Sequence, residues 1–285
     1  MKKEIVIVSF AVLFAAALSF CIWDTVSAGK NESKTLEEGA SDGYFSVTAA
    51  DLDTEAGTGS LLSPDEYGKT EEIREPGTYI LSGEYKDTIF INTEDQNVHL
   101  ILDNVVIGSP SGPAIYARSA GKLFITAKEG TENHLSDSAY YTDKEANAAI
   151  FANCDLTING SGSLFVSGYN KDAVHGKRIV KVLDAKVSLK SKRCGIRGND
   201  GIYLSPEVLT VESEKFGLQT VDSGTPPMGD IEITGGTLSM IAGDTGISSQ
   251  SDVYVSGCSL AIQAVVSPVT ARGEQHLEEG AVTIV

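Results

Sequence analysis

The chain has 285 residues, is 41% hydrophobic but only 7% aromatic, and carries a formal net charge of −17. The apolar fraction is too high for an intrinsically disordered chain, and four cysteines in this length exclude a small disulfide scaffold. The acidic balance also argues against general nucleic-acid binding, because phosphate contacts require a basic face. These numbers leave a folded protein that is long enough for a sizeable core.

The first 28 residues have the pattern of a secretory signal peptide. Residues 1–3 supply a basic start, an apolar run covers 5–20, and small residues in 26–28 predict cleavage after Ala28. A lipoprotein signal ending at Cys21 is disfavoured because bulky Phe20 precedes it, and an uncleaved N-terminal anchor is a further alternative. All three place the folded part outside the cytoplasm, either secreted or at the cell surface.

Residues 29–76 are predicted to form an acidic linker followed by an N-terminal cap. Between positions 31 and 75, twelve Asp and Glu face three Lys and Arg, and apolar residues show little periodicity. From Gly77 the pattern changes to apolar residues at alternate positions, as at Ile89 and Ile91. Alternation of this kind indicates half-buried strands.

From Ile150 onward, the apolar positions repeat with a period of about 22 residues, which predicts a repeat domain over residues 77–285. Counted from Val174, apolar residues follow at offsets of 6, 8, 13 and 15, and the same offsets recur from Ile196 and Ile247. From Leu218 they recur after an insertion of seven residues. One such unit cannot bury its apolar face alone, whereas stacked units can.

Two other repeat folds fit this period poorly. The asparagine-containing line of leucine-rich repeats is absent, and a propeller blade requires about 40 residues. We therefore predict an all-β fold, a parallel β-helix with coils about 4.8 Å apart. Its hand should be right, following the crossover rule for parallel strands.

Five segments of the sequence are similar to a known family. They are SGPAIYA at 111–117, KLFIT at 122–126, GTENHLSD at 130–137, NAAIF at 147–151 and DLTINGSG at 155–162. Together they resemble the carbohydrate-binding β-helix proteins of bacterial cell surfaces, which are relatives in fold of pectate lyases. The resemblance extends from about Gly77 to the C-terminus. It implies a right-handed β-helix, binding of cellulose or of acidic sugars such as polygalacturonate, and calcium held in turns.

The acid column that this resemblance associates with calcium is interrupted. It reads Asp172, Cys194, Phe216 and Thr245, so one acid is retained. Calcium requires six to eight oxygen ligands, which Cys and Phe cannot supply. An acidic loop is the better candidate, although it is equally consistent with a solvated insertion. The predicted metal ligands are Asp137, Asp143, Glu145, Asn147 and Asp172.

A basic segment stands out against the acidic remainder. Residues 171–200 contain nine Lys and Arg but three Asp. The repeat stacks Lys171, Arg193 and Lys215 in one column and places His175 beside Arg197 in another. Like charges about 4.8 Å apart repel, and a bound polyanion relieves that repulsion. The alternative is a solvated face that prevents aggregation. The predicted carbohydrate-binding residues are Lys171, His175, Lys177, Arg178, Arg193, Arg197 and Lys215.

We expect a non-catalytic protein that binds an acidic, plant-type polysaccharide. Arginine recognises carboxylates with two parallel hydrogen bonds, which favours an acidic sugar. Neutral glycans are commonly bound by aromatic stacking, but the one tryptophan, Trp23, leaves with the signal peptide. We expect a monomer with no nucleic-acid and no protein partner.

Two alternatives to non-catalytic binding stay open. In a polysaccharide lyase, Arg193, Arg197 or Lys177 would remove a proton while Asp172 and Asp200 held calcium. In an adhesin or structural spacer, the stacked coils would only project from the surface. The fold by itself does not distinguish these functions.

Overall fold

The computed structural model of the chain describes residues 45–55, 59–221 and 229–285, so the predicted signal peptide lies outside the described residues. These residues belong to one compact unit, Gly43–Val285. They form parallel strands and one short helix, α2 (Ala49–Leu52). Within these ranges, no helix combines the length and the apolar character that a membrane span requires.

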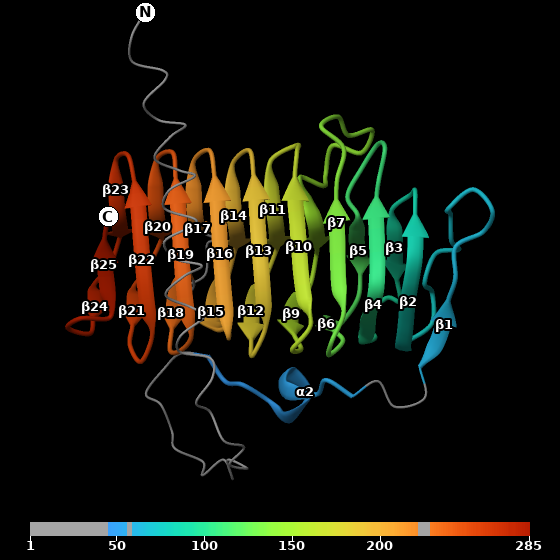
Figure 1. Cartoon of the computed structure of the whole chain (residues 1–285), viewed down its shortest axis with the longest axis horizontal. Helices are drawn as coiled ribbons and strands as arrows, with labels where there is room; N and C mark the ends of the chain where they lie inside the picture. The colour runs from blue at the N-terminus through green and yellow to red at the C-terminus, as the bar shows by residue number, and fades with distance from the viewer. Residues whose placement is uncertain (1–44, 56–58, 222–228) are drawn as a thin grey trace, which may run out of the picture. The chain divides into compact units, whose positions relative to one another are not determined.

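The strands stack into three faces, and each coil contributes to all three (Figure 1). Face 1 is an eight-stranded sheet of β3 (Ile89–Asn92), β5 (Ile115–Ser119), β8 (Ala148–Ala152), β11 (Asp172–Gly176), β14 (Cys194–Gly198), β17 (Phe216–Thr220), β20 (Thr245–Ser249) and β23 (Ser267–Ala271). Face 2 consists of β6 (Lys122–Ala127), β9 (Asp155–Asn159), β12 (Ile179–Leu183), β15 (Gly201–Ser205), β18 (Asp230–Ile233), β21 (Val253–Val255) and β24 (Gln275–Leu277). Face 3 consists of β7 (Glu132–Ser136), β10 (Ser163–Gly168), β13 (Lys186–Ser191), β16 (Val208–Ser213), β19 (Thr237–Ala242), β22 (Ser259–Ala264) and β25 (Val282–Ile284).

Faces 2 and 3 join into one sheet at the first coils, because β4 (Val98–Gly108) runs through the corner between them. It pairs with β2 (Gly77–Tyr85), which in turn pairs with β1 (Ser60–Leu62). In Figure 1 the front strands of face 3 run upward, the chain returns behind through face 1, and the coils advance from right to left. This is the right-handed sense, and the predicted right-handed parallel β-helix is confirmed.

The predicted register is confirmed in all three faces. On face 1, Val174 pairs with Ile196, which pairs with Leu218. On face 2, Val180 pairs with Ile202. The β-helix has about 9 turns of about 23 residues, slightly more than the predicted period. A long loop between β7 and β8 and the insertion before β18 account for the difference.

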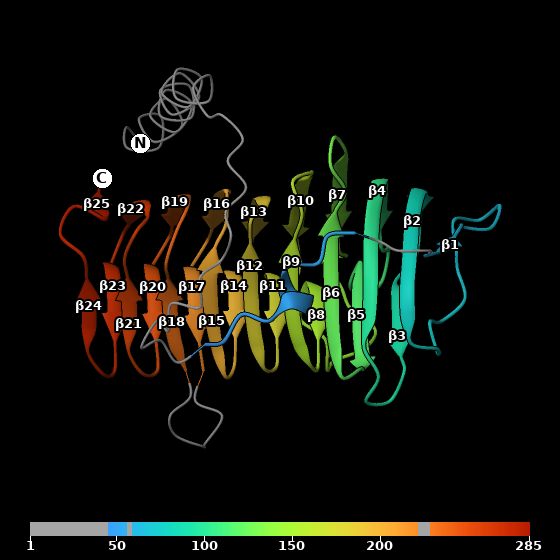
Figure 2. The ribbon, with the colours of Figure 1, turned by 90° about the horizontal axis from the view of Figure 1, so that it is seen from below.

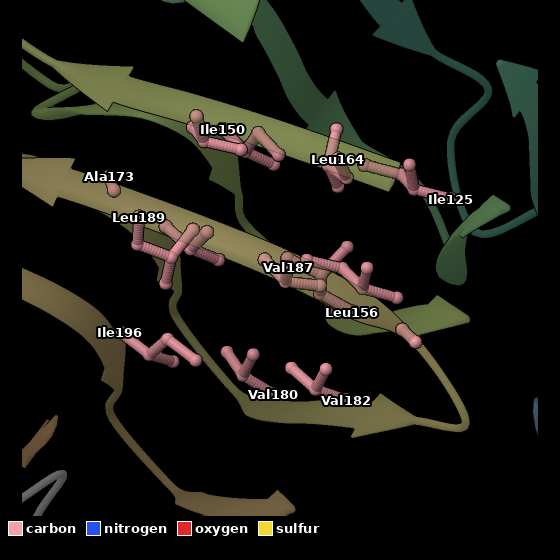
Figure 3. Packing of buried hydrophobic residues seen from close by; sticks show 14 of the residues in the cluster. Ile125, Ile150, Leu156, Leu164, Ala173, Val180, Val182, Val187, Leu189 and Ile196 are labelled. Atoms are coloured by element: carbon pink, nitrogen blue, oxygen red, sulfur yellow. The ribbon is translucent and has the colours of Figure 1, made fainter. Parts of the chain in front are cut away.

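The core is a set of aliphatic columns inside the coils. Val180 and Val182 of face 2 lie opposite Val187 and Leu189 of face 3, and Ile196 of face 1 closes the triangle (Figure 3). Burial of each such side chain stabilises the fold by about 1.5–3 kcal/mol. Stacked parallel strands bury both the apolar columns and their backbone hydrogen bonds. Aromatic residues are not needed inside such a coil, consistent with the low aromatic content.

The GTEN motif has a structural role in this core. Asn133 is fully buried and pairs in register with the core residue Leu164. Its Oδ1 accepts a hydrogen bond from the Val105 amide at 3.1 Å, and its Nδ2 donates to Thr131 Oγ1 at 2.9 Å and to the Ser163 carbonyl at 3.2 Å. The side chain therefore satisfies the backbone where β4 bends between faces 2 and 3.

Residues 45–55, which we call the strap, lie across the outside of face 2 (Figure 2). Thr48 caps α2 in a reciprocal capping box with Asp51. The fully buried Asp51 carboxylate also binds Lys122 of β6 and accepts hydrogen bonds from Thr157 of β9 at 2.6 Å and Lys181 of β12 at 3.0 Å. One carboxylate thereby joins the strap to three successive coils.

Candidate functional site

The outward side of face 1 has two unlike halves. An outer column runs along it with one residue per coil, and its members are Phe90, Tyr116, Phe151, His175, Arg197, Gln219, Ser248 and Thr270. Residues 137–147, which we call the covering loop, bury the aromatic half. Tyr141 and Ala146 of this loop pack against Tyr116 and Phe151. The column becomes polar from His175 onward.

The acidic residues of the covering loop mostly hold the loop itself together. Asp137 is buried and accepts hydrogen bonds from the Tyr141 hydroxyl at 2.6 Å and the Tyr169 amide at 2.5 Å. Burial raises the pKa of Asp137 to about 6, although these hydrogen bonds act to lower it. Asp143 accepts from the Glu145 amide at 2.8 Å and lies 3.7 Å from Arg118.

The five predicted calcium ligands therefore each lie at a described position, but they are not gathered around one point. Asn147 Oδ1 lies 2.6 Å from His175 Nδ1, and Asp172 is bound by an arginine. Within the described ranges, no three His, Cys, Asp or Glu side chains form a group suited to a metal ion. Calcium binding stays a prediction that this geometry does not support.

Asp172 and Arg193 form a bidentate ion pair on the outside of face 1. Arg193 Nε donates to Asp172 Oδ1 at 2.6 Å, and Nη2 binds Oδ2. The Asp172 side chain is fully buried, whereas about a quarter of the Arg193 side chain is exposed, at 24%. Burial raises the pKa of Asp172, and the hydrogen bond from Arg193 acts to lower it. The acid retained from the interrupted column thus orients an arginine.

His175 is buried between two asparagines. Its Nδ1 lies 2.6 Å from Asn147 Oδ1, and its Nε2 lies 3.0 Å from Asn199 Oδ1. Burial lowers the pKa of His175 to about 3, and the positive charge of Arg197 adds to this effect. The imidazole is therefore neutral near pH 7. A neutral ring has one donor and one acceptor nitrogen, so one of the two amides presents its NH₂ group instead. His175 thus supports the surface and adds no charge to it.

Arg197 has a hydrogen-bond donor that no residue of the described part of the chain uses. Its Nε atom is buried and has no hydrogen-bond partner in the described part of the chain. Its guanidinium forms none of the ion pairs found among the described residues, and the side chain is partly exposed. Burial and the charge of Arg193 lower the pKa of Arg197. A buried donor without a partner is costly, which indicates a position ready to accept an anionic ligand.

Three exposed lysines accompany the two arginines. Lys171, Lys177 and Lys215 each lack a carboxylate within ion-pair distance over the ranges that the structure covers. Lys177 lies above the Phe151 ring, 5.6 Å from its centre. We call the set the cation cluster, and its members are Lys171, Lys177, Arg193, Arg197 and Lys215.

Most other basic residues of this segment are neutralised by neighbouring coils. Lys186 pairs with Glu207 and Lys190 with Glu212 along face 3, and Lys192 pairs with Glu214 in the turns that lead from face 3 to face 1. Arg178, one of the predicted binding residues, lies 3.5 Å from Asp155 and 3.9 Å from Asp200. The unpaired cations of this segment therefore form a narrower surface: Arg197 lies on face 1, and the other members lie in the turns at its edges.

Sequence reasoning missed several residues of this surface. Asn199 orients His175, and Phe216 and Gln219 lie on the outside of β17, the next coil after Arg197. The register that predicted the core also placed Gln219 one period after Arg197. The same spacing separates Lys190 from Glu212 and Lys192 from Glu214, so part of the neutralisation was visible in the sequence.

Comparison with known proteins agrees with these observations. Residues 67–282 match the model of a family described as carbohydrate-binding domain-containing protein. The chain belongs to this family. A carbohydrate-binding domain-containing protein from Acetivibrio thermocellus is 28% identical over 217 residues, which are 73% of this chain and 76% of that relative. The resemblance stated from the sequence motifs is confirmed.

A solved structure also resembles this chain in fold. It is a polysaccharide lyase-like protein from C. thermocellum, determined as a gadolinium derivative. The two share a TM-score of 0.73 and 24% sequence identity, over 79% of this chain and 98% of the other. At this identity the likeness establishes the β-helix fold alone and does not establish the chemistry of face 1.

Proposed function

We propose that the protein binds an acidic polysaccharide, a polymer of uronic acids such as polygalacturonate, on the outside of face 1 without cleaving it. The observation that carries this proposal is the cation cluster. Arg193 is paired with Asp172, and the other four members lack a paired carboxylate in the described part of the chain. In a chain of net charge −17, such a group is an unusual local concentration of positive charge. Membership in a family of carbohydrate-binding domain-containing proteins makes a glycan the expected anion.

The arrangement of the cluster suits a polymer better than a single small anion. Lys171, Arg193 and Lys215 come from successive coils, and backbone hydrogen bonds connect Arg193 to Lys171 at 2.7 Å and Phe216 to Arg193 at 2.8 Å. Parallel strands lie about 4.8 Å apart, so the charges recur at that interval along the helix axis. A polyuronate carries a carboxylate on every sugar and would meet several of these cations at once.

Cleavage is the second candidate, because one observation favours it. The lowered pKa of Arg197 would make this side chain a better proton acceptor, as a lyase requires. The acids that were expected to hold calcium are committed elsewhere, however, since Asp172 binds Arg193 and Asp200 lies near Arg178. These contacts support binding over cleavage.

The first test is an affinity measurement on three variants with soluble polygalacturonate. We expect Arg197→Ala and Lys171→Ala to weaken binding, Arg197→Ala by about tenfold or more, since a tenfold loss corresponds to about 1.4 kcal/mol. The matched control is Lys190→Ala, which removes an exposed lysine that is paired with Glu212 on face 3. Its affinity should stay within about twofold of the unmodified protein.

Three outcomes would contradict the proposal. Unchanged affinity in Arg197→Ala would remove the cation cluster from the site. Absence of binding to any glycan on an array would favour a structural spacer. Release of unsaturated uronate, followed by its ultraviolet absorbance, would identify a lyase, and loss of that activity in Arg197→Ala would assign the base.

We also propose that the folded part is exported to the outside of the cell or to its surface. Support comes from the basic and apolar pattern of residues 1–28, which lie outside the described residues. Fractionation of cells expressing the full chain tests this point. Recovery of the intact protein in the cytoplasm would contradict it.

A further inference from the structure

The cation cluster occupies only the first coils of the uncovered half of face 1. Beyond it, strand β17 presents Phe216 and Gln219 on its outer side, and β20 presents Ser248 in register with Gln219, while Thr245, in register with Phe216, is buried. None of these four side chains belongs to the hydrophobic core. Toward the other end, the covering loop buries Tyr116 and Phe151 and closes the surface. A chain-like ligand held at the cluster can therefore extend in one direction, along β17 and β20.

Phe216 is an aromatic residue in a position that packing does not explain. Leu218, two residues further along β17, is fully buried in the core, whereas Phe216 is partly exposed and lies outside it. Its neighbours in register are Cys194 and Thr245. In the described part of the chain no aromatic ring stacks on Phe216, unlike Phe165 of face 3, which stacks on His134 at 4.8 Å. Part of the Phe216 side chain is therefore open to solvent.

Gln219 completes this arrangement. It pairs in register with Arg197 on one side and Ser248 on the other and is partly exposed. Its amide makes no hydrogen bond to any residue that the structure describes. An amide supplies both donors and an acceptor, which suits sugar hydroxyls as well as carboxylates. Strand β17 thus presents an amide beside the cation Arg197 and, three residues earlier, an aromatic ring.

We propose that Phe216 and Gln219 form a second subsite, in which the ring stacks on a sugar and the amide hydrogen-bonds its polar groups. This inference rests on the proposed function, because the neighbouring sugar is held at Arg197. Coils lie about 4.8 Å apart, comparable to the length of one sugar residue in a chain. The ligand is therefore an oligouronate of several residues lying along the helix axis, with its extension on the β17 and β20 side.

The experiment compares digalacturonate and pentagalacturonate as probes. Phe216→Ala should weaken pentagalacturonate about three- to tenfold, because it removes an aromatic contact to the sugar, and leave digalacturonate nearly unchanged. Gln219→Ala should weaken the pentamer by about threefold, the loss of one neutral hydrogen bond. The matched control is Phe165→Ala, which removes a partly exposed ring from face 3. If Phe216→Ala folds poorly, Phe216→Leu keeps the bulk and should still lose the pentamer preference.

Salt dependence separates this inference from the proposal on which it rests. Arg197→Ala should flatten the fall of affinity with ionic strength, whereas Phe216→Ala should leave that slope unchanged because it removes no charge. Pentamer affinities of Phe216→Ala and Gln219→Ala equal to that of Phe165→Ala would overturn the second subsite. The proposed function would survive that result if Arg197→Ala still weakened both probes. Failure of the unmodified protein to bind either probe would overturn both.

Discussion

At the scale of single residues, Asn133 gives the GTEN motif a structural role. Its side chain occupies an inward position that Leu164 occupies on the next coil, and it pairs three backbone or side-chain groups of the bend. A leucine there would fit the apolar column but would leave the Val105 amide without a partner. Buried polar groups that lose their partners cost about 1–3 kcal/mol each.

We therefore expect Asn133→Ala to lower the free energy of unfolding by about 1–3 kcal/mol, because the Val105 amide and the Ser163 carbonyl lose their partner. Denaturant unfolding measures this change. Asn170→Ala is the control, since Asn170 Nδ2 makes one exposed hydrogen bond to the Ala139 carbonyl. Equal stability of the two variants would show that water replaces the buried contacts of Asn133.

The proposed binding surface also shows which site residues can be predicted from the sequence. Arg197 was predicted because a fixed spacing places it beside His175, and that pairing is observed. The neutral state of His175 could not be predicted, since it depends on burial between Asn147 and Asn199, which come from different coils. The role of Asp172 was likewise hidden, because its arginine partner lies on the following coil. Partners of buried charges depend on three-dimensional neighbours that apolar periodicity does not specify.

At the scale of elements, the strap is the part of the molecule that the sequence pattern described least. It falls within residues 29–76, predicted as a linker and cap, and it has no repeat of its own. The capping spacing of Thr48 and Asp51 is the signal that could have located α2. That Asp51 reaches Lys122, Thr157 and Lys181 follows from packing against face 2.

Asp51→Asn should detach the strap while leaving the coils folded. Burial acts to raise the pKa of Asp51, but the hydrogen bonds from Lys122 and its neighbours outweigh burial and lower this pKa below the ordinary value of 3.8. Breaking a buried ion pair costs about 3–5 kcal/mol. Here this cost weakens the attachment of the strap to face 2 and does not unfold the coils. Amide hydrogen exchange should accelerate in residues 45–55 and stay slow in β13, with Asp53→Asn as the exposed control.

The same carboxylate predicts a pH dependence with a definite sign. Because folding lowers the pKa of Asp51, its stabilising effect is complete above the unfolded value of about 3.8 and is lost as the pH falls below it. The difference in strap exchange between the unmodified protein and Asp51→Asn should therefore be large at pH 7 and shrink in acid below pH 3.8. A difference that stays constant across this range would contradict a role for the ionised carboxylate.

At the scale of the whole molecule, the β-helix was predictable because one rule generates it. Each coil must repeat inward aliphatics such as Val174, Ile196 and Leu218, and stacking then specifies the strand partners. The pairing of charged side chains does not follow from this repeat of inward aliphatic residues. The same stacking pairs Lys190 with Glu212 on face 3 and leaves Lys171 unpaired on face 1. A net charge therefore says little about where an acidic protein can hold an anion.

Two triple variants with equal net charge separate local from global electrostatics. Replacing Lys171, Lys177 and Lys215 by Gln, or replacing the paired lysines Lys128, Lys186 and Lys190 by Gln, removes three positive charges and takes the formal net charge from −17 to −20 in either case. The first set should weaken polygalacturonate binding by about tenfold or more, because it removes cations that lack carboxylate partners. The second should change affinity by about twofold or less, since exposed pairs contribute little to the local field.

Salt titrations of the two triple variants complete this comparison. At an ionic strength of about 0.15 M the screening length is about 8 Å, so charges on another face of the β-helix contribute weakly to a ligand on face 1. The variant that lacks Lys171, Lys177 and Lys215 should therefore lose most of its salt dependence, and the variant that lacks Lys128, Lys186 and Lys190 should keep it. Equal losses of affinity in the two would mean that binding follows the net charge of the molecule, and the assignment of the glycan to face 1 would be wrong.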